Sequence, residues 1–209
     1  MKRVINLDNW NRKEHFKFFS ALDDPFWGIT TTVDFTSIYQ QSKNMEVSFF
    51  LYSVYFLLKC INATTAFKLR IENGEVVEYD KINISPTRED GTFGFGFFEY
   101  DTDLSLFIEN AEKEIHRVKN STGLSFSKDT ARADVIRYSA LPWFAFSEMK
   151  HAGSIQTGDS IPKISTGKLI QEKKKLLLPI SISVHHGLVD GRNVAEFIQN
   201  LKDGQNNTL

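Results

Sequence analysis

A ten-residue apolar run, "FFLYSVYFLL" at residues 49–58, places the strongest constraint on how this chain folds. A helix that is hydrophobic on every side has to be surrounded by other parts of the protein. A membrane-spanning helix needs about 20 apolar residues, so this run is too short to cross a bilayer. We therefore predict a buried helix over residues 47–63. It contains Cys60, the one cysteine of the chain, which excludes an internal disulfide and is expected to be an inert core thiol.

The segments on either side of this helix alternate between strand and helix patterns. Asn73-Gly74 predicts a type I′ hairpin, because both central positions of that turn need positive φ. Apolar residues at 3–4 spacing predict a helix that ends near residue 119, capped by Asp101 or Asp103. An amphipathic helix at 9–19 is expected to turn Trp10, His15 or Glu14, and Phe18 to one side. Further strands are expected at 2–7, 26–35, 82–86, 92–99 and 135–146, and a long hairpin at 161–186. A short helix is expected after Asp34, and another at 193–202 before a polar tail. Residues 147–160 are expected to form a Gly/Ser-rich loop.

Interspersed strands and helices, with several strands joined by hairpins, indicate an α/β fold. We predict a two-layer sandwich with a mixed β-sheet, formed by a single domain over residues 1–209. The formal net charge of −1 provides no electrostatic basis for binding nucleic acid. "MKRVINLDNW" at the N-terminus lacks an apolar stretch of signal-peptide length, so a cytoplasmic protein without a membrane partner is expected.

Two histidines stand at the end of an apolar strand in "SISVHHGLVDGRNV", residues 181–194. Since residues i and i+2 share a strand face, His186 continues the apolar face of Ile182 and Val184, and His185 lies on the other. An imidazole at that position can accept a proton near neutral pH, as a general base must. The spacing alone supports a polar turn equally well, with Asp190 as a cap and the following glycine at positive φ. Adjacent histidines that face opposite ways, with no HExxH motif, predict no metal site.

Four motifs in register resemble the chloramphenicol acetyltransferase family along the whole chain. They are "NWNRKEHF" near the N-terminus, "YSALPWFAF" at 138–146, "IPKISTGK" at 161–168 and "HHGLVDG" at 185–191. A related D-H-x-x-x-D-G motif occurs in dihydrolipoyl acyltransferase cores, but their N-terminal signature differs from the one in this sequence. The resemblance implies a CoA-dependent acyltransferase fold and transfer of acetyl from acetyl-CoA to a hydroxyl of chloramphenicol. It also implies a homotrimer with active sites at the subunit interfaces, and no metal.

The resemblance assigns five residues to the chemistry. His186 matches the general base that takes the proton from the acceptor hydroxyl, which then attacks acetyl-CoA directly. Ser139 matches the hydroxyl that stabilises the oxyanion. Asp190 matches a buried carboxylate that pairs with Arg12 and holds the histidine loop. Ser165 stands where the family has a threonine that hydrogen-bonds a water in the transition state.

Further positions are assigned to binding or to structure. Lys168 is assigned to a contact with CoA phosphate, although a lone lysine is usually a surface residue. Phe19, Trp27 and Phe93 match positions that line the acceptor pocket. Arg137 replaces a position that is usually Asn, and it is counted with the acceptor-binding residues. His15 and His185 are interpreted as structural.

The sequence departs from the family on the acceptor side. Its loop reads H-H-G-L-V-D-G where the family has H-H-A-V-C-D-G, and "TREDGTFGFGFF" at 87–98 is shorter than the usual segment. There Phe93, Phe95 and Phe97 alternate with glycines, which fits either core packing with close approach of another segment or an apolar wall for a flat acceptor. An acyltransferase acting on another hydroxylated acceptor, and a non-catalytic trimeric ligand-binding relative, therefore stay open.

Overall fold

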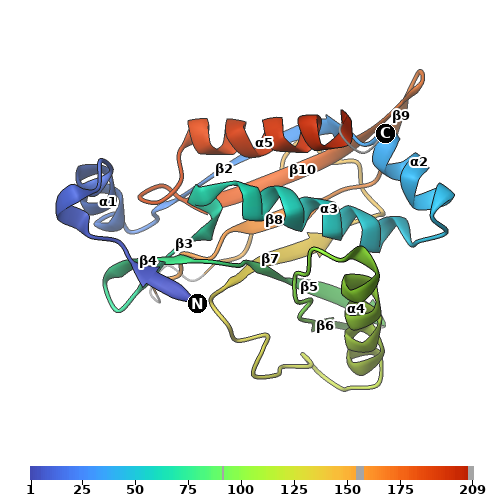
Figure 1. The fold of residues 1–209 in the computed structure, drawn as a ribbon, viewed down its shortest axis with the longest axis horizontal. Coiled ribbons are helices and arrows are strands. Elements are labelled where there is room, and N and C mark those ends of the chain that lie inside the picture. The colour runs from blue at the N-terminus through green and yellow to red at the C-terminus, as the bar shows by residue number, and fades with distance from the viewer. Residues whose placement is uncertain (91, 154–157, 207–209) are drawn as a thin grey trace.

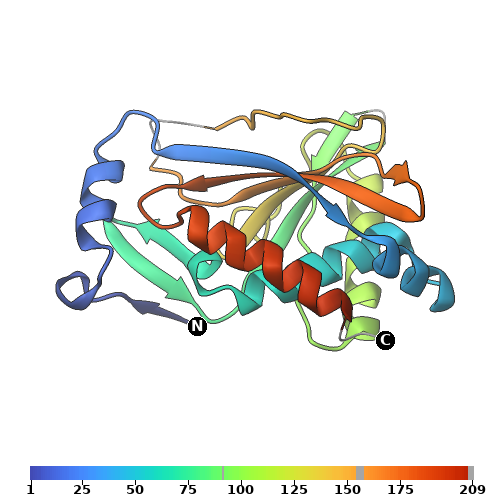
Figure 2. The same ribbon diagram turned by 90° about the horizontal axis from the view of Figure 1, so that it is seen from above.

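A mixed β-sheet forms the centre of the protein, and helices cover one of its faces (Figures 1 and 2). The computed structural model describes residues 1–90, 92–153 and 158–206. Within these residues the strands of the main sheet are β2 (Phe26–Asp34), β5 (Asn83–Asp90), β6 (Thr92–Phe95), β7 (Val135–Ala140), β8 (Lys163–Thr166), β9 (Ile170–Glu172) and β10 (Lys175–His185). Their order is β2-β10-β8-β7-β5-β6, with β9 beside β10. The β5–β7 and β7–β8 pairs are parallel and the others antiparallel, which confirms the predicted mixed sheet.

The helices and a smaller antiparallel sheet complete the fold. The helices are α1 (Lys13–Ser20), α2 (Thr36–Asn44), α3 (Phe49–Ala63), α4 (Leu104–Lys119) and α5 (Gly191–Asn206), with 3-10 turns at Leu7–Asn9 and Thr65–Lys68. The small sheet has the order β1-β4-β3, formed by β1 (Lys2–Val4), β4 (Glu75–Tyr79) and β3 (Leu69–Glu72). None of the described helices combines the length and hydropathy needed to cross a membrane.

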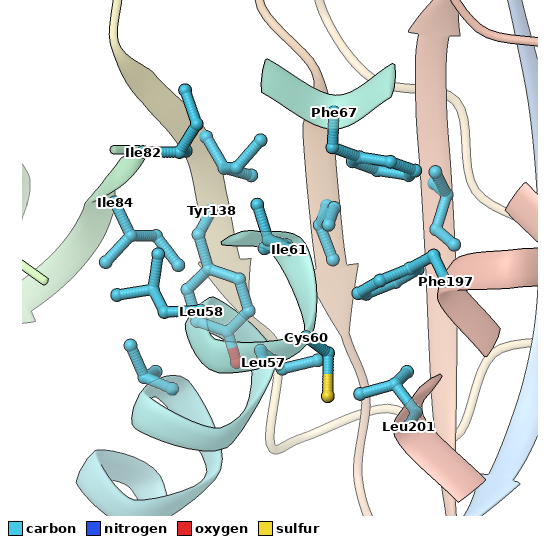
Figure 3. Packing of buried hydrophobic residues seen from close by; sticks show 14 of the residues in the cluster. Leu57, Leu58, Cys60, Ile61, Phe67, Ile82, Ile84, Tyr138, Phe197 and Leu201 are labelled. Atoms are coloured by element: carbon cyan, nitrogen blue, oxygen red, sulfur yellow. The ribbon is translucent and has the colours of Figure 1, made fainter. Parts of the chain in front are cut away.

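Helix α3 is the buried helix that the apolar run predicts. Leu57 and Ile61 are fully buried, and Figure 3 shows them between Tyr138 of the sheet and Phe197 of α5. The helix α3 therefore packs against both the main sheet and α5. Burial raises the pKa of the Cys60 thiol to about 12, which agrees with an inert core cysteine.

Local signals in the sequence set two element boundaries correctly. Asn73 and Gly74 adopt φ values of 52° and 81°, which is the type I′ hairpin between β3 and β4. Asp103 caps α4, because its carboxylate accepts the N–H groups of Ser105 at 2.8 Å and Leu106 at 3.2 Å.

Other boundaries differ from the prediction. Helix α1 begins at Lys13, so Trp10 lies outside it, and the buried residue is Phe16, while Phe18 is 64% exposed. The apolar spacing of the segment allowed more than one inward face, and contact with the rest of the core selects Phe16. Strand β7 ends at Ala140, before the proline at 142, and α5 begins at residue 191 and includes part of the expected tail. The expected 147–160 loop includes residues 154–157, which lie outside the described residues, as do 207–209 of the tail.

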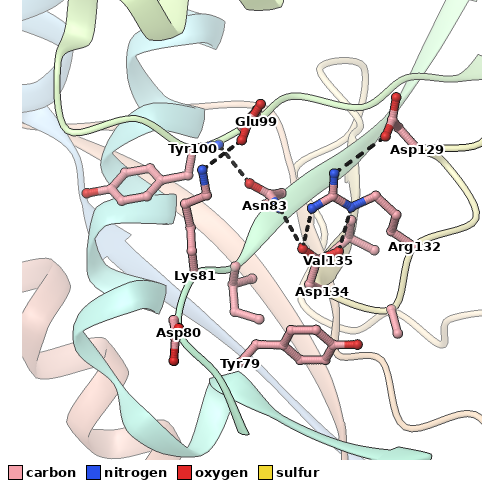
Figure 4. Close-up of polar contacts among 12 residues, drawn as sticks. Tyr79, Asp80, Lys81, Asn83, Glu99, Tyr100, Asp129, Arg132, Asp134 and Val135 are labelled. Atoms are coloured by element: carbon pink, nitrogen blue, oxygen red, sulfur yellow. Dashed lines mark hydrogen bonds and ion pairs between the residues drawn. The ribbon is translucent and has the colours of Figure 1, made fainter. Parts of the chain in front are cut away.

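A polar network fixes the start of β7 against β5 (Figure 4). Asn83 donates to the carboxylate of Asp134 at 3.0 Å and accepts the N–H of Tyr100 at 3.0 Å. Arg132 donates to both oxygens of Asp134, at 2.9 and 2.6 Å. Burial would raise the pKa of Asp134, but the bonds from Arg132 outweigh it and hold that pKa below its usual value. The network positions the strand that carries Ser139.

Candidate active site

His186 is the first residue after β10, in a turn that the rest of the chain holds firmly. Its backbone N–H donates to the carbonyl of Pro25 at 2.8 Å. Its ring stacks on Phe19, with 3.9 Å between the centroids and 18° between the planes, and Trp27 lies 5.4 Å away. Its Nδ1 is buried without a hydrogen-bond partner in the described residues. The imidazole is therefore fixed by stacking, and Nε2 is the ring nitrogen left for a substrate.

The two faces of β10 are divided as the alternation predicts. Ile182 and Val184 are buried in the core. Ser183 and His185 line a cavity of about 700 Å³ on the opposite face. His185 is 4% exposed, and its burial lowers its pKa to about 4, so the ring is neutral at physiological pH.

Arg12 and Asp190 meet beside the His186 turn. The guanidinium Nη1 lies 2.5 Å from Asp190 Oδ2, and Nη2 donates to the His186 carbonyl at 3.2 Å. Oδ1 of Asp190 caps α5 by accepting the N–H groups of Arg192 and Asn193. Partial burial would raise the pKa of Asp190, but these N–H groups and the Arg12 guanidinium outweigh it and hold that pKa below its usual value.

The capping role and the pairing role of Asp190 coexist, so the alternatives that the sequence left open are not exclusive. The glycine that follows, Gly191, begins α5 and is not among the glycines of positive φ. The carboxylate is also less buried than expected, since the Asp190 side chain is 36% exposed in the single chain and that of Arg12 is 17% exposed.

We expect Arg12 and Asp190 to behave as one unit in a double-mutant cycle. Asp190→Asn and Arg12→Val should each lower stability, and the double variant should lose less than the sum. The partial exposure places the coupling at about 1–2 kcal/mol, between the ~0.2–1 kcal/mol of exposed pairs and the ~3–5 kcal/mol of buried ones. Denaturant unfolding measures it, and strictly additive losses would show that the two side chains do not interact.

Ser139 lies on β7 at the edge of a second cavity, of about 570 Å³, which Phe93 and Trp143 also line. The hydroxyl of Thr87 donates to Ser139 Oγ at 3.1 Å. Since Oγ accepts this bond, the hydroxyl proton of Ser139 is free to point toward a ligand. Thr87 was not predicted as part of the site, because nothing in the sequence distinguishes it from other strand threonines.

The Phe/Gly segment divides between packing and cavity lining. A Cβ on Gly94 would lie 2.4 Å from the Ser125 hydroxyl, so this glycine allows the close approach of another segment. Phe95 stacks on Phe126, and Phe97 lies under the Arg132 guanidinium. Phe93 is 51% exposed and lines the cavity beside Ser139. The rings of Phe93 and Phe95 contact each other, but β6 ends at Phe95, so Phe97 does not extend an apolar wall.

Ser165 is 1% exposed, and its hydroxyl lies 3.0 Å from Nε2 of His151. His151 comes from the segment 141–153, which crosses the face of the sheet away from the helices (Figure 2). Burial, together with the charge of Lys163, lowers the pKa of His151. His151 was not predicted as a neighbour of Ser165, because this contact depends on the path of a long loop.

The other assigned residues lie farther from the chemistry. Lys168 is exposed and follows Gly167, which lines the cavity beside Ser139. Arg137 is exposed on β7 and lines neither of the two cavities. His15 is exposed on α1, so the interpretation of this residue as structural has no support from its packing.

His186 and Ser139 do not meet within one chain. Ser139 is paired with Ser165, and Ser165 with Ser181, so Ser139 lies two strands across from β10. Five residues at ~3.4 Å along β10 and two inter-strand spacings of ~4.8 Å give a separation of about 20 Å. A single chain therefore keeps these two residues apart.

Comparison with known proteins gives one consistent family. The family model described as "Chloramphenicol acetyltransferase" matches residues 2–202. Chloramphenicol acetyltransferase 3 of Escherichia coli is 28% identical over 208 residues, covering 98% of this chain and 97% of the relative. The chloramphenicol acetyltransferase of Staphylococcus aureus is 29% identical over 212 residues, covering 98% and 97%.

Solved structures agree with the sequence comparisons. A chloramphenicol acetyltransferase structure superposes with a TM-score of 0.89 at 29% identity, covering 97% of this chain and 99% of that one. A probable dihydrolipoamide acetyltransferase from Listeria monocytogenes shares the fold, with a TM-score of 0.69 at 13% identity over 98% of this chain and 94% of that one. The predicted CoA-dependent acyltransferase fold is confirmed, and the chain belongs to the chloramphenicol acetyltransferase family.

Proposed function

We propose that this protein is an acetyltransferase that moves acetyl from acetyl-CoA to a hydroxyl of chloramphenicol, and so confers resistance to that antibiotic. The observation that carries the proposal is the His186 turn, where Phe19 stacks on the imidazole and Arg12 ties Asp190 to the His186 carbonyl. A general base needs such a fixed ring. The names of the family and of its relatives support the choice of donor and acceptor.

The proposed mechanism is a direct transfer. Nε2 of His186 takes the proton of the acceptor hydroxyl as its oxygen attacks the thioester carbonyl. The carbonyl π electrons move onto oxygen, and the Ser139 hydroxyl donates to this oxyanion. The oxyanion collapses, the C–S bond breaks, and the imidazolium returns the proton to the CoA thiolate. No acyl-enzyme forms, and no metal is needed.

The separation of about 20 Å between His186 and Ser139 supports an active site shared between two copies of the chain. We propose a homotrimer in which His186 of one subunit reaches the Ser139 half-site of the next. The cavity beside Ser139 would receive the thioester, with Trp143 and Lys168 on the donor side and Phe93 at the acceptor rim. Because acetyl-CoA is the proposed donor, we also propose that the enzyme acts in the cytoplasm.

Release of free CoA thiol from acetyl-CoA, measured with and without chloramphenicol, tests the proposal. Chloramphenicol should increase the release, and the product should carry one acetyl ester. A second candidate function is transfer to a more polar hydroxylated acceptor. The observation in its support is that Lys163 and Asp159 line the larger cavity, with side chains only 7% and 8% exposed. Thiol release with a polar alcohol but not with chloramphenicol would select this candidate.

Two aromatic residues of the Ser139 cavity should separate the substrates kinetically. Phe93→Ala should raise the acceptor KM by about fivefold and leave the acetyl-CoA KM unchanged, because truncating a half-exposed ring costs ~1 kcal/mol of apolar contact. Trp143→Ala, the matched control in the same cavity, should raise the acetyl-CoA KM instead. If Phe93→Ala lowers only the melting temperature, the ring serves packing alone.

A further inference from the structure

The larger cavity contains a buried cation with unused hydrogen-bonding capacity. The Lys163 ammonium lies 3.0 Å from Asp159 Oδ2 and 3.9 Å from the centroid of the Phe26 ring. Asp159 Oδ1 accepts the N–H of Ile161 at 3.0 Å, so both oxygens of this carboxylate are engaged. An ammonium carries three N–H donors, and Asp159 is its one anionic partner among the described residues. What this ion pair can still form is therefore hydrogen bonds from the free N–H groups of the Lys163 ammonium to an acceptor group.

His185 adds a second donor to the same cavity. Its Nδ1 accepts the backbone N–H of Gly187 at 3.1 Å, so the proton of the neutral ring is on Nε2. No bond from Nε2 to another described residue is present, and the side chain lines the cavity. Ser183, two residues earlier on the same face of β10, pairs with Lys163 across the sheet. The His185 ring and the Lys163 ammonium both lie against the Phe26 ring, so the two donors share one part of the cavity.

The other charges of this cavity lie at its mouth. Asp24, Glu148 and Lys150 are exposed, so solvent and salt screen them. His151, which is half-buried, contacts the Ser165 hydroxyl. A charge in the interior has more effect on a ligand than an exposed one, because less water screens it. A ligand in the interior of the cavity is therefore recognised by the Lys163 ammonium and the His185 ring.

We propose that Lys163 and His185 form a subsite for an anionic oxygen group, a carboxylate, carried by the acceptor at the end remote from its reacting hydroxyl. Lys163 and Ser165 share a face of β8, two residues or about 7 Å apart, and Ser165 is the cross-strand neighbour of Ser139. An acceptor with its hydroxyl near Ser139 would thus place its far end beside the ammonium. The nitro group of chloramphenicol is a weaker, neutral occupant. This inference rests on the proposed function for the identity of the ligand as an acceptor.

Equilibrium binding of two probes tests the subsite without requiring catalysis. The probes are arylpropanediols that differ only in a para carboxylate or a para methyl group, titrated calorimetrically in the absence of acetyl-CoA. Wild type should bind the carboxylate about 10-fold or more tightly than the methyl compound, as for a hydrogen bond to a charged group. Lys163→Met combined with Asp159→Asn, which leaves no unpaired charge, should abolish this preference and leave the affinity for the methyl probe unchanged.

The controls use the lysines themselves. Lys163→Arg should keep the preference, and Lys150→Met, at the mouth of the same cavity, should also keep it. The proposal is overturned if wild type binds neither probe or shows no preference, or if the double variant keeps the preference. Loss of the preference in Lys150→Met would overturn it as well. A preserved binding preference with no thiol release from either probe would instead count against the proposed acetyl transfer.

Discussion

His186→Ala is expected to reduce acetyl transfer by ~10²–10⁴-fold, the usual contribution of a general base. The physical reason is that no other imidazole replaces it. His185 lies on the opposite face of the strand end, and His151 is bonded to Ser165. The rate of thiol release at saturating concentrations of both substrates measures the loss. Binding of CoA, measured by calorimetry, should be unchanged, since the proposed donor cavity lies beside Ser139.

Two variants make this result specific. His15→Ala removes an exposed imidazole from α1 and should leave the rate unchanged. His185→Ala removes a buried neutral ring and should cost less than His186→Ala. Comparable losses from the two adjacent histidines, in proteins with the same melting temperature, would refute the division of roles between them.

Ser139→Ala is expected to lower kcat by ~10²–10³-fold with little change in either KM, because one oxyanion donor is lost. In the proposed mechanism the hydroxyl acts on the charge that develops in the transition state and not on the ground-state substrates, so the effect belongs in kcat. Steady-state kinetics with each substrate varied in turn measures it.

Thr87→Val is the companion to this variant. It keeps the Ser139 hydroxyl but removes the bond that orients it, so its kcat should lie between those of wild type and Ser139→Ala. If Ser139→Ala raises a KM and leaves kcat unchanged, the serine contributes to binding and another group stabilises the oxyanion.

The sequence by itself determined the features that depend on neighbours along the chain. The apolar run produced the buried α3, Asn73-Gly74 produced the hairpin, and Asp103 capped α4. The alternation along β10 separated the core face from the cavity face correctly, since side-chain direction in a strand follows from period two alone. The motifs that carry the family resemblance also paired Arg12 with Asp190, which the structure brings together.

Only the tertiary structure decided what depends on strand order and on the paths of loops. With β8 between β10 and β7, His186 and Ser139 lie about 20 Å apart, although the sequence motifs place both in one mechanism. The segment 141–153 brings His151 to Ser165, and the turn into β8 places Asp159 against Lys163, inside a cavity that no spacing predicts. Periodicity specifies which way a side chain points within its own element. Which side chain it meets is decided by long-range pairing, whose energy comes from burial in the assembled fold.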